Sequence, residues 1–277
     1  MSTIPDFAAL LAAAFAEDLG EAGDVTSAAT VPAGARLNAV LAARDPIVLA
    51  GLPIAEAAFR HLDPAAGFTP LAADGDRLAS GAILARISGD ARALLAAERT
   101  ALNFVQRLSG IATLTRAYGD AISGTGATLL DTRKTTPGWR ALEKYAVRMG
   151  GGRNHRMGLF DAVLIKDNHI AVAGGVTEAV ARARRAWAGP IEVEIDRIDQ
   201  IEPALAAGAD RLLLDNMEPN TLRQAVALIV GRVLTEASGG VRLETIRAIA
   251  ETGVDLISAG RITQSAPAAD IGLDFLD

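Results

Sequence analysis

One stretch of this sequence, Asp131–His169, concentrates the residue types that bind anions. It holds eight Lys and Arg residues and two His against four Asp and Glu, whereas the whole chain of 277 residues has a formal net charge of −6. All three lysines of the chain, Lys134, Lys144 and Lys166, fall within it. Because the positive charge is concentrated here, we expect convergent Lys, Arg and His side chains to bind a small anionic ligand rather than to form a solvated face.

Polar residues also follow several short apolar runs in the second half of the chain. Lys134, Lys166, Glu194 and Asp215 each stand at or near the end of such a run. If the runs are parallel strands of a barrel, these side chains share one mouth and are candidates for catalysis. A lysine there could form a Schiff base, clamp a pyrophosphate or pair with an acid. A carboxylate could bind a metal through water, hold a sugar hydroxyl or stabilise a developing cation. Glu192 shares a face with Glu194, so a buried ion-pair network is an alternative.

Two glycine-containing turns near the end of the chain suit a phosphate. Ser238-Gly239-Gly240 follows one apolar run and precedes a helix expected to begin near Arg242, and Gly260 follows the next run. Backbone N–H groups in such turns, together with a helix N-terminus, can bind a phosphate, as the last strands of many α/β barrels do. A plain turn between strand and helix is the alternative for the first of them.

His155 and Arg156 lie side by side in the glycine-rich sequence GRNHRMG, an arrangement that suits a bound carboxylate. His61 stands alone in an apolar helical stretch and is expected to be structural. Arg99 lies on a helix outside the barrel-like half, and composition alone would place it on the surface.

The composition narrows the class of protein. There is no cysteine, which excludes disulfides, thiolate metal sites and a cysteine nucleophile. No apolar run has the length that a bilayer requires, and the first residues lack the basic region of a signal peptide. We therefore expect a cytoplasmic location and no membrane partner. An acidic chain with one local basic cluster is not typical of a nucleic-acid-binding protein.

The order of the elements predicts an α/β fold. In the first part of the chain, the pattern predicts a helix at 5–19 that ends at Gly20, followed by a turn at 23–27. Extended segments at 36–50 and strands within 68–88 come next. A long helical stretch at 91–122 follows, which a break near Ser109-Gly110 could divide. From residue 127 onward, six short apolar runs alternate with helical stretches at 138–149, 176–187, 198–207, 219–230 and 242–251. Such βα units, with polar residues after every run, favour a barrel over an open sheet.

Several motifs together resemble the quinolinate phosphoribosyltransferase family. They are EDLGEAGDVTS (17–27), ERTALNFVQRLSGIAT (98–113), DTRKTTPG (131–138), GGGRNHRMGLFDAVLIKDNHI (150–170), EVEID (192–196), LLLDN (212–216), EASGG (236–240) and SAPAADIGLDF (265–275). The resemblance spans nearly the whole chain. It implies an N-terminal α/β sandwich domain at 1–108, joined by the C-terminal tail 265–277, and an incomplete α/β barrel of about seven strands at 109–264. The apolar runs themselves indicate six strands.

The resemblance also implies the residues of the site. Family positions that bind quinolinate match Arg99, Thr132, Arg133, Lys134, His155 and Arg156. Positions that bind phosphoribosyl pyrophosphate (PRPP) match Lys134, Lys166, Glu194, Asp215, Ser238, Gly239 and Gly260, with Gly240 in the same turn. Among them, Lys134, Lys166, Glu194 and Asp215 are the expected catalytic residues, and Mg²⁺ is the expected cofactor, with Glu194 and Asp215 near it. The chain departs from the family at Arg261 and Gln264, where a small residue and a His are more frequent.

The implied protein is a homodimer in which Arg99 reaches into the partner subunit's site, and further assembly into a hexamer stays open. The implied activity is transfer of phosphoribosyl from PRPP to quinolinate with loss of CO₂, which gives nicotinate mononucleotide and pyrophosphate in NAD biosynthesis. The alternatives are a related transferase acting on nicotinate, a Schiff-base lyase using Lys166, and a non-catalytic phosphosugar-binding protein. The intact DTRKTTPG and NHRMG sequences favour quinolinate.

Overall fold

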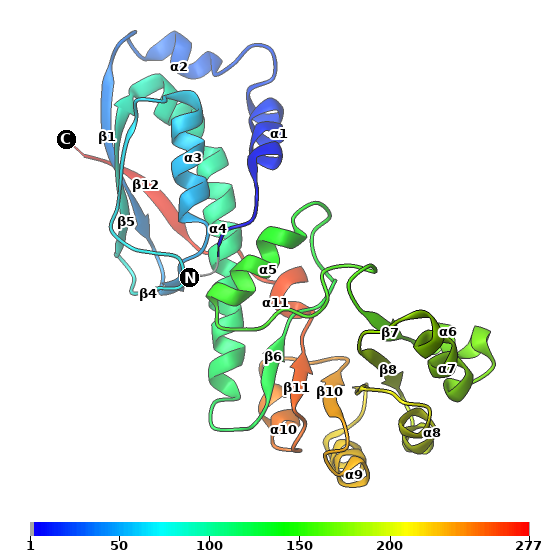
Figure 1. Cartoon of the computed structure of the whole chain (residues 1–277). Helices are drawn as coiled ribbons and strands as arrows, with labels where there is room; N and C mark the ends of the chain where they lie inside the picture. Colours follow the sequence, from blue (N-terminus) through cyan, green and yellow to red (C-terminus); the bar gives the residue numbers. More distant parts are fainter. Residues whose placement is uncertain (1–2, 277) are drawn as a thin grey trace. The chain divides into compact units, whose positions relative to one another are not determined.

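The computed structural model describes residues 3–276, which divide into two compact units (Figure 1). The first unit contains the residues up to Arg116, Thr136–Gly151 and the residues from Ala266 onward; the second contains Ala117–Thr135 and Gly152–Ser265. The boundaries expected from the sequence assign Thr136–Gly151 to the barrel, whereas by compactness this segment groups with the first unit. Residues 1, 2 and 277 of the expected domains lie outside the described residues.

An antiparallel sheet with the strand order β12-β1-β5-β3 forms the centre of the first unit, accompanied by the two-stranded sheet β2-β4. The strands are β1 (Arg36–Ala43), β2 (Ile47–Val48), β3 (Gly67–Pro70), β4 (Arg77–Leu78), β5 (Ile83–Asp90) and β12 (Ile271–Leu276). The helices are α1 (Ala8–Leu19), α2 (Val25–Thr30), α3 (Leu52–Leu62), α5 (Arg140–Met149) and most of α4 (Ala91–Ala121). Phe59 of α3 packs with its ring centre 6.4 Å from that of Phe68 on β3, so α3 covers this sheet.

The N-terminal helices show one success and one failure of the sequence prediction. Helix α1 ends at Gly20, as expected. Phe15 of this helix stacks on the exposed ring of His61 of α3, a packing contact in line with the structural role expected for that histidine. The expected turn at 23–27 is instead the start of α2. The side chain of Asp24 accepts hydrogen bonds from the N–H groups of Thr26 and Ser27 and so caps this helix. A six-residue helix is too short to show a hydrophobic period, which is why the prediction missed it.

Helix α4 runs without a break through Ser109 and Gly110, contrary to the break considered from the sequence. The glycine at position 110 is instead explained by packing. A Cβ at this position would lie 1.9 Å from the carbonyl oxygen of Pro267. The glycine therefore lets the C-terminal segment approach the helix backbone, and the next residues form β12, which pairs antiparallel with β1 from Asn38–Leu276 to Ala43–Ile271.

A parallel sheet with the strand order β6-β11-β10-β9-β8-β7 forms the second unit. Its strands are β6 (Thr128–Leu130), β7 (Val163–Ile165), β8 (Ile191–Ile195), β9 (Arg211–Asp215), β10 (Leu234–Ser238) and β11 (Leu256–Ser258). Its helical segments are α6 (Asp167–Ala173), α7 (Val176–Ala186), η1 (Ile198–Gln200), α8 (Ile201–Ala206), α9 (Pro219–Ile229), α10 (Ile246–Ala250) and α11 (Arg261–Gln264). Together with the antiparallel sheet of the first unit, this arrangement confirms the expected mixed α/β fold class.

The number of parallel strands agrees with the count made from the apolar runs. Within the described residues the sheet has six strands, and the seventh that the resemblance implies is reduced to a single parallel bridge between Leu130 and Arg153, beside β6. A strand of one bridged residue leaves no apolar run in the sequence, so periodicity alone could not reveal it.

Strand alternation directs acidic side chains to the inner face of this sheet. Along β8, Ile191, Val193 and Ile195 are fully buried, and Glu192 and Glu194 occupy the alternate positions. The same rule holds along β10, where Glu236 and Ser238 share a face. The described part of the chain contains no helix that is both long and apolar enough to cross a membrane.

Candidate active site

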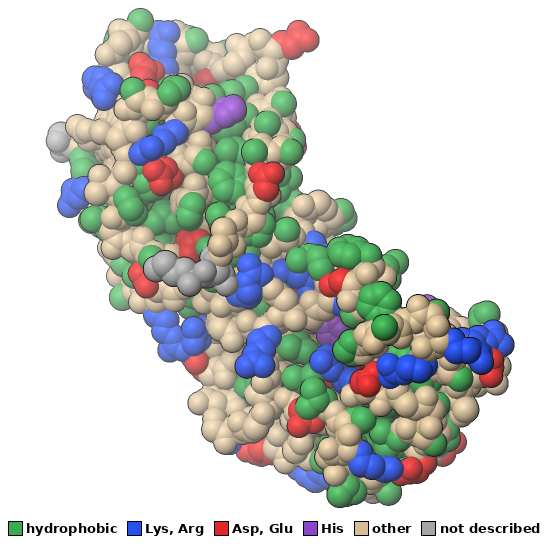
Figure 2. All heavy atoms as spheres, in the orientation of Figure 1, with side chains coloured by type: hydrophobic (Ala, Val, Ile, Leu, Met, Phe, Trp, Pro, Cys, Tyr) green, Lys and Arg blue, Asp and Glu red, His purple; other side chains and the backbone are tan. Residues whose placement is uncertain are grey.

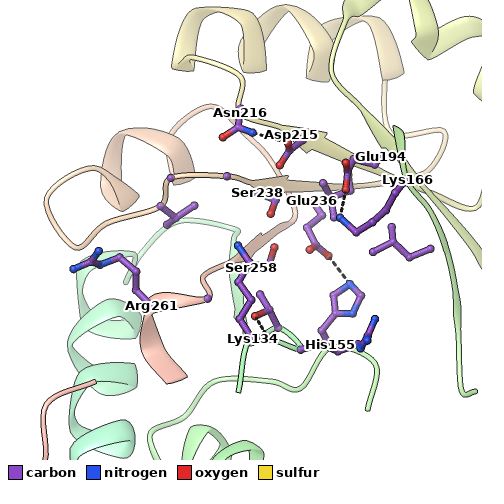
Figure 3. Close-up of a pocket in the computed structure, with 18 of the residues that line it drawn as sticks. Lys134, His155, Lys166, Glu194, Asp215, Asn216, Glu236, Ser238, Ser258 and Arg261 are labelled. Carbon is purple, nitrogen blue, oxygen red and sulfur yellow. Dashed lines mark hydrogen bonds and ion pairs between the residues drawn. The ribbon is translucent and has the colours of Figure 1, made fainter. Parts of the chain in front are cut away.

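The carboxyl ends of the six parallel strands surround a cavity of about 640 Å³ (Figure 3). Each strand, or the loop that follows it, contributes side chains to the wall. The residues expected from the sequence that line this cavity are Thr132, Arg133, Lys134, His155, Arg156, Lys166, Glu194, Asp215, Ser238, Gly239, Gly240 and Gly260. Arg261 and Gln264, where the chain departs from the family pattern, also line it. Arg99 is an exposed residue of α4 and is not part of this lining.

An ion pair joins the ends of two neighbouring strands. Lys166 follows β7 directly, and Glu194 lies near the end of β8; the parallel register that pairs Ile165 with Val193 brings the two side chains together. The Lys166 Nζ atom lies 2.5 Å from Glu194 Oε2. Lys166 is exposed, whereas a lysine activated for Schiff-base chemistry is usually desolvated or next to another cation. The geometry therefore favours the charge-pairing role over the nucleophilic one.

The turn after β10 approaches the end of β9 closely. The N–H of Asn216 donates to the carbonyl of Ser238 (2.9 Å), and the Asn216 amide donates to Asp215 Oδ2 (2.6 Å). A Cβ on Gly239 would lie only 2.2 Å from Asn216 Oδ1, and both Gly239 and Gly240 have positive φ. Only glycine fits this turn, and its backbone faces the cavity without a side chain in the way.

The expected helix after this turn begins later than the sequence indicated. Helix α10 starts at Ile246 rather than near Arg242, and it has five residues. The phosphate-binding capacity of the turn therefore depends on the backbone N–H groups of the loop rather than on a helix N-terminus.

Lys134 is held by contacts with the segments that follow β6 and β11, which are neighbouring strands at one edge of the sheet. Its N–H donates to Thr132 Oγ1 (3.0 Å), and its carbonyl accepts from Thr263 Oγ1 (2.8 Å). A Cβ on Gly260 would lie 2.8 Å from Lys134 Cδ, so the glycine provides the space through which the lysine reaches the cavity. Figure 3 shows Lys134 directed into the cavity beside Ser258.

The loop that carries His155 is anchored by a buried acid that the sequence reading did not single out. Asp131, at the end of β6, is completely buried. Its carboxylate accepts hydrogen bonds from the side chain of Asn154 (2.6 Å) and from the N–H of His155 (2.8 Å). These charge-assisted bonds fix the backbone from which His155 and Arg156 extend. The position of Asp131 before Thr132 in DTRKTTPG is the only sequence signal for this role.

Both ring nitrogens of His155 are engaged within the cavity wall. Nδ1 accepts a hydrogen bond from the N–H of Arg156 (2.7 Å), and Nε2 lies 3.0 Å from Glu192 Oε2 and 3.5 Å from Glu236 Oε2. The imidazole thus links the loop that faces the cavity to acids on β8 and β10. Figure 3 shows the contact with Glu236 as a dashed line.

Two guanidinium groups strengthen the positive potential of the cavity. Burial, and then the charge of Arg133, lower the pKa of Arg156, although an arginine stays protonated at any physiological pH. Arg156 also donates to the carbonyl of Ala162 (3.1 Å), which fixes part of its side chain. Figure 2 shows Lys and Arg side chains near a His in the region of the parallel sheet. An anion placed between these cations would relieve their mutual repulsion.

A buried cluster of charges lies at the inner face of β8, β9 and β10. Glu192 and Glu236 are buried, and Arg211 Nη1 lies 3.9 Å from Glu192 and 3.5 Å from Glu236. His155, Glu192 and Glu236 place ligand atoms within 4.8 Å of one another, a spacing that a metal ion could use. Arg211 already supplies a positive charge to the same carboxylates, so the cluster fits the buried ion-pair network better. Sequence reasoning considered Glu192 for such a network but gave Glu236 no role of its own, although Glu236 stands two residues before Ser238 on the same strand face.

Comparison with known proteins agrees with these features. The family model for the quinolinate phosphoribosyl transferase N-terminal domain matches residues 24–109, and the model for the C-terminal domain matches residues 111–274. The chain is 46% identical over 266 residues to a carboxylating nicotinate-nucleotide pyrophosphorylase of Mycobacterium leprae, covering 94% of this chain and 93% of that protein. It is 45% identical over 263 residues to a probable enzyme of the same name from Bacillus subtilis, covering 94% and 90%. The crystal structure of nicotinate-nucleotide pyrophosphorylase from Ehrlichia chaffeensis superposes with a TM-score of 0.95 at 40% identity, covering 99% of this chain and 100% of that chain.

Proposed function

This chain belongs to the quinolinate phosphoribosyltransferase family, and we propose that it transfers the phosphoribosyl group of PRPP to quinolinate, with loss of CO₂, to give nicotinate mononucleotide and pyrophosphate. The observation that carries this proposal is the composition of the cavity. One wall combines Arg133 and Arg156 with Lys134, and the opposite strand ends supply Glu194 and Asp215. Such a site can hold several anionic groups and still stabilise a cation.

The basic wall is suited to the pyridine dicarboxylate. Arg133 and Arg156 are the groups that would pair with its carboxylates, because a guanidinium can donate two parallel hydrogen bonds to a carboxylate. Thr132 and His155 form the adjoining wall, and His155 keeps Arg156 in position through its backbone contact. These contacts would orient the ring nitrogen toward the ribose, and orientation is a large part of catalysis for a two-substrate reaction.

The opposite side is suited to PRPP. The turn Ser238-Gly239-Gly240 and Gly260 offer backbone N–H groups to a phosphate, and Lys134 and Lys166 are near enough to the cavity to offset charge on a pyrophosphate. Glu194 and Asp215 are acceptors for the ribose hydroxyls.

Mg²⁺ is part of the same proposal. Carboxylate oxygens are ligands that this hard cation prefers, and Glu194 and Asp215 both line the cavity, although Glu194 is also paired with Lys166. These two residues fit an indirect role, in which they hold waters of an ion that is mainly bound by the substrate's own oxygens. When bound, Mg²⁺ would neutralise negative charge on the departing pyrophosphate.

The reaction can then proceed without a covalent enzyme intermediate. The bond between ribose C1 and the pyrophosphate oxygen breaks, and Lys134 and Lys166 stabilise the charge that develops on the leaving group. Glu194 and Asp215 stabilise the oxocarbenium-like C1, which the pyridine nitrogen attacks. The ring nitrogen is now positively charged, so the neighbouring carboxylate can leave as CO₂. The electron pair of the broken bond stays on the ring carbon, which takes up a proton.

One assay tests the proposed function. Purified protein is incubated with PRPP, Mg²⁺ and either quinolinate or nicotinate, and both nicotinate mononucleotide and CO₂ are measured. Equal amounts of the two products from quinolinate, and none from nicotinate, are expected. Mononucleotide formed from nicotinate would overturn the choice of substrate but keep the phosphoribosyl site. Absence of product from both, together with an imine that borohydride traps at Lys166 when a carbonyl substrate is supplied, would support the lyase alternative instead.

A homodimer with Arg99 completing the partner subunit's site belongs to this proposal, as does a cytoplasmic location. Arg99 is exposed on α4, which leaves its guanidinium available to a second copy. Subunit mixing tests this arrangement. Arg99→Ala and Lys134→Ala are each expected to be nearly inactive, and an equal mixture is expected to regain about a quarter of the wild-type rate, since half of the dimers then hold one intact site. A mixture no more active than its components would contradict the shared site.

A further inference from the structure

The cluster behind His155 is not balanced in charge. Glu192 on β8 and Glu236 on β10 supply two carboxylates, and Arg211 on β9 supplies one guanidinium. His155 faces both acids from the loop before β7, and Ser258 on β11 adds only a neutral hydroxyl. With a neutral imidazole, these groups sum to one negative charge. The charge of Arg156 also acts on Glu192, from the cavity wall, but besides burial the groups that shift the pKa of Glu236 are Glu192, His155 and Ser258. One bound proton removes that imbalance.

The carboxylate of Glu236 is also poorly solvated. Its side chain has no exposed surface. The Ser258 hydroxyl and the Glu192 carboxylate are near enough to affect its pKa, but neither of its oxygens has a hydrogen bond of ordinary geometry within the described residues. Its cationic neighbours lie at 3.5 Å, which is too long for a strong charge-assisted hydrogen bond. Burying such a carboxylate as an anion costs much free energy, and protonation of the carboxylate removes most of this cost.

We propose that Glu236 is a positioning residue of this site, which keeps one proton in the buried cluster and thereby holds His155 against the cavity wall. The argument rests on the proposed function, because the consequence concerns the binding of quinolinate. His155 and Glu236 both line the cavity, so a substrate with two carboxylates would add negative charge directly above the cluster. When the cluster holds its proton, it does not repel the carboxylates of that substrate. When the proton is lost, the net negative charge of the cluster repels them.

The electrostatics of the individual groups agree with this role. Burial, and then the charge of Glu192, raise the pKa of Glu236 to about 7. Burial lowers the pKa of His155, but the hydrogen bond with Glu192 and the charges of both acids outweigh it, so the net direction is upward. The cluster is therefore expected to lose its proton just above neutral pH. Above that point, the affinity for quinolinate falls and the affinity for PRPP changes less.

The kinetic test compares the wild-type enzyme with Glu236→Gln, which keeps the size of the side chain but cannot ionise. For the wild-type enzyme, kcat/KM for quinolinate is expected to fall by up to tenfold per pH unit above about pH 7, because one proton is lost. In Glu236→Gln that decline is expected to be absent, because the side chain has no proton to lose. Glu143→Gln is the matched control, because Glu143 is equally buried but pairs with Arg107 in the first unit. It is expected to keep the wild-type pH profile.

A second measurement does not depend on activity. Because the pKa of Glu236 is raised in the folded protein, the native state binds more protons than the unfolded state between about pH 4.5 and 7. The stability of the wild-type protein should therefore decline over this range relative to Glu236→Gln, which thermal unfolding at a series of pH values would show. Parallel pH profiles of the two proteins, in kinetics and in unfolding, would overturn the inference. A wild-type enzyme that forms no mononucleotide would instead refute the proposed function, and the unfolding series would still decide whether Glu236 holds a proton.

Discussion

The ammonium group of Lys166 lies 2.5 Å from Glu194 Oε2, so the ends of β7 and β8 are joined by an ion pair at the edge of the cavity. The lysine is about half exposed, but the carboxylate is largely buried. A substrate that draws Lys166 toward a pyrophosphate would release Glu194 to face the ribose. In the proposed reaction, the lysine would then stabilise the leaving group and the carboxylate would stabilise C1.

Glu194→Gln is expected to lower kcat on the order of a hundredfold with smaller changes in either KM, because the carboxylate acts mainly on charge that develops in the transition state. Steady-state kinetics with both substrates would measure this. Glu202→Gln is the control, since Glu202 forms an exposed pair with Arg232 outside the cavity lining. A large rise in KM at unchanged kcat would mean that Glu194 stabilises the bound ground state and the transition state equally.

Arg133→Ala is expected to raise the KM for quinolinate by about 10- to 100-fold, since a hydrogen bond to a charged group contributes about 1.5–3 kcal/mol. The KM for PRPP should change little. Arg133→Lys should recover only part of the loss, because an ammonium cannot reproduce the planar fork of donors. Arg223→Ala, on the exposed face of α9, provides the comparison. An unchanged KM for quinolinate would remove Arg133 from the binding site.

Gly239→Ala is expected to weaken PRPP binding because the new methyl group would lie 2.2 Å from Asn216 Oδ1 and displace the turn. Gly231→Ala separates this collision from backbone strain, since Gly231 also has positive φ but nothing lies within 4 Å of its added Cβ. Both variants should lose about 1–2 kcal/mol of stability from the left-handed backbone. Only Gly239→Ala should raise the KM for PRPP, and equal KM values in the two variants would contradict the role of this turn.

Gly110→Ala is expected to destabilise the protein by about 1–3 kcal/mol, because its methyl group would overlap the backbone of Pro267. The matched variant is Gly119→Ala in the same helix, where the added Cβ has no neighbour within 4 Å. Removing that glycine should stabilise the helix by about 0.5–1 kcal/mol. Thermal unfolding of the two variants should therefore shift in opposite directions; shifts of the same sign would show that the close approach at Gly110 is relaxed at little cost.

Much of this architecture could be predicted because it is local. The six parallel strands have short apolar runs, and the polar residues that end them, such as Lys166 and Asp215, mark the mouth of the cavity. Helix α2 was missed because its six residues are too few to show a hydrophobic period. The late start of α10 was missed because Arg242, Leu243 and Glu244 are good helix formers by composition.

The interior contacts could not be predicted in the same way. Whether Glu236 meets His155 depends on which strands are neighbours, and the sequence does not state the order β10-β9-β8. Likewise, Gly110 reads as a helix breaker until the path of the C-terminal segment is known. The role of Arg99 was obtained from the family resemblance, since nothing in its own helix distinguishes it from a surface arginine.

The use of lysine in this chain has a practical consequence for labelling and immobilisation. Lys144 is completely buried, whereas Lys134 and Lys166 are exposed and line the cavity. Amine-reactive dyes, crosslinkers and activated resins would therefore attach, among the lysines, to the two that the proposed reaction uses. Coupling through introduced cysteines avoids this problem, because the chain has none of its own to compete.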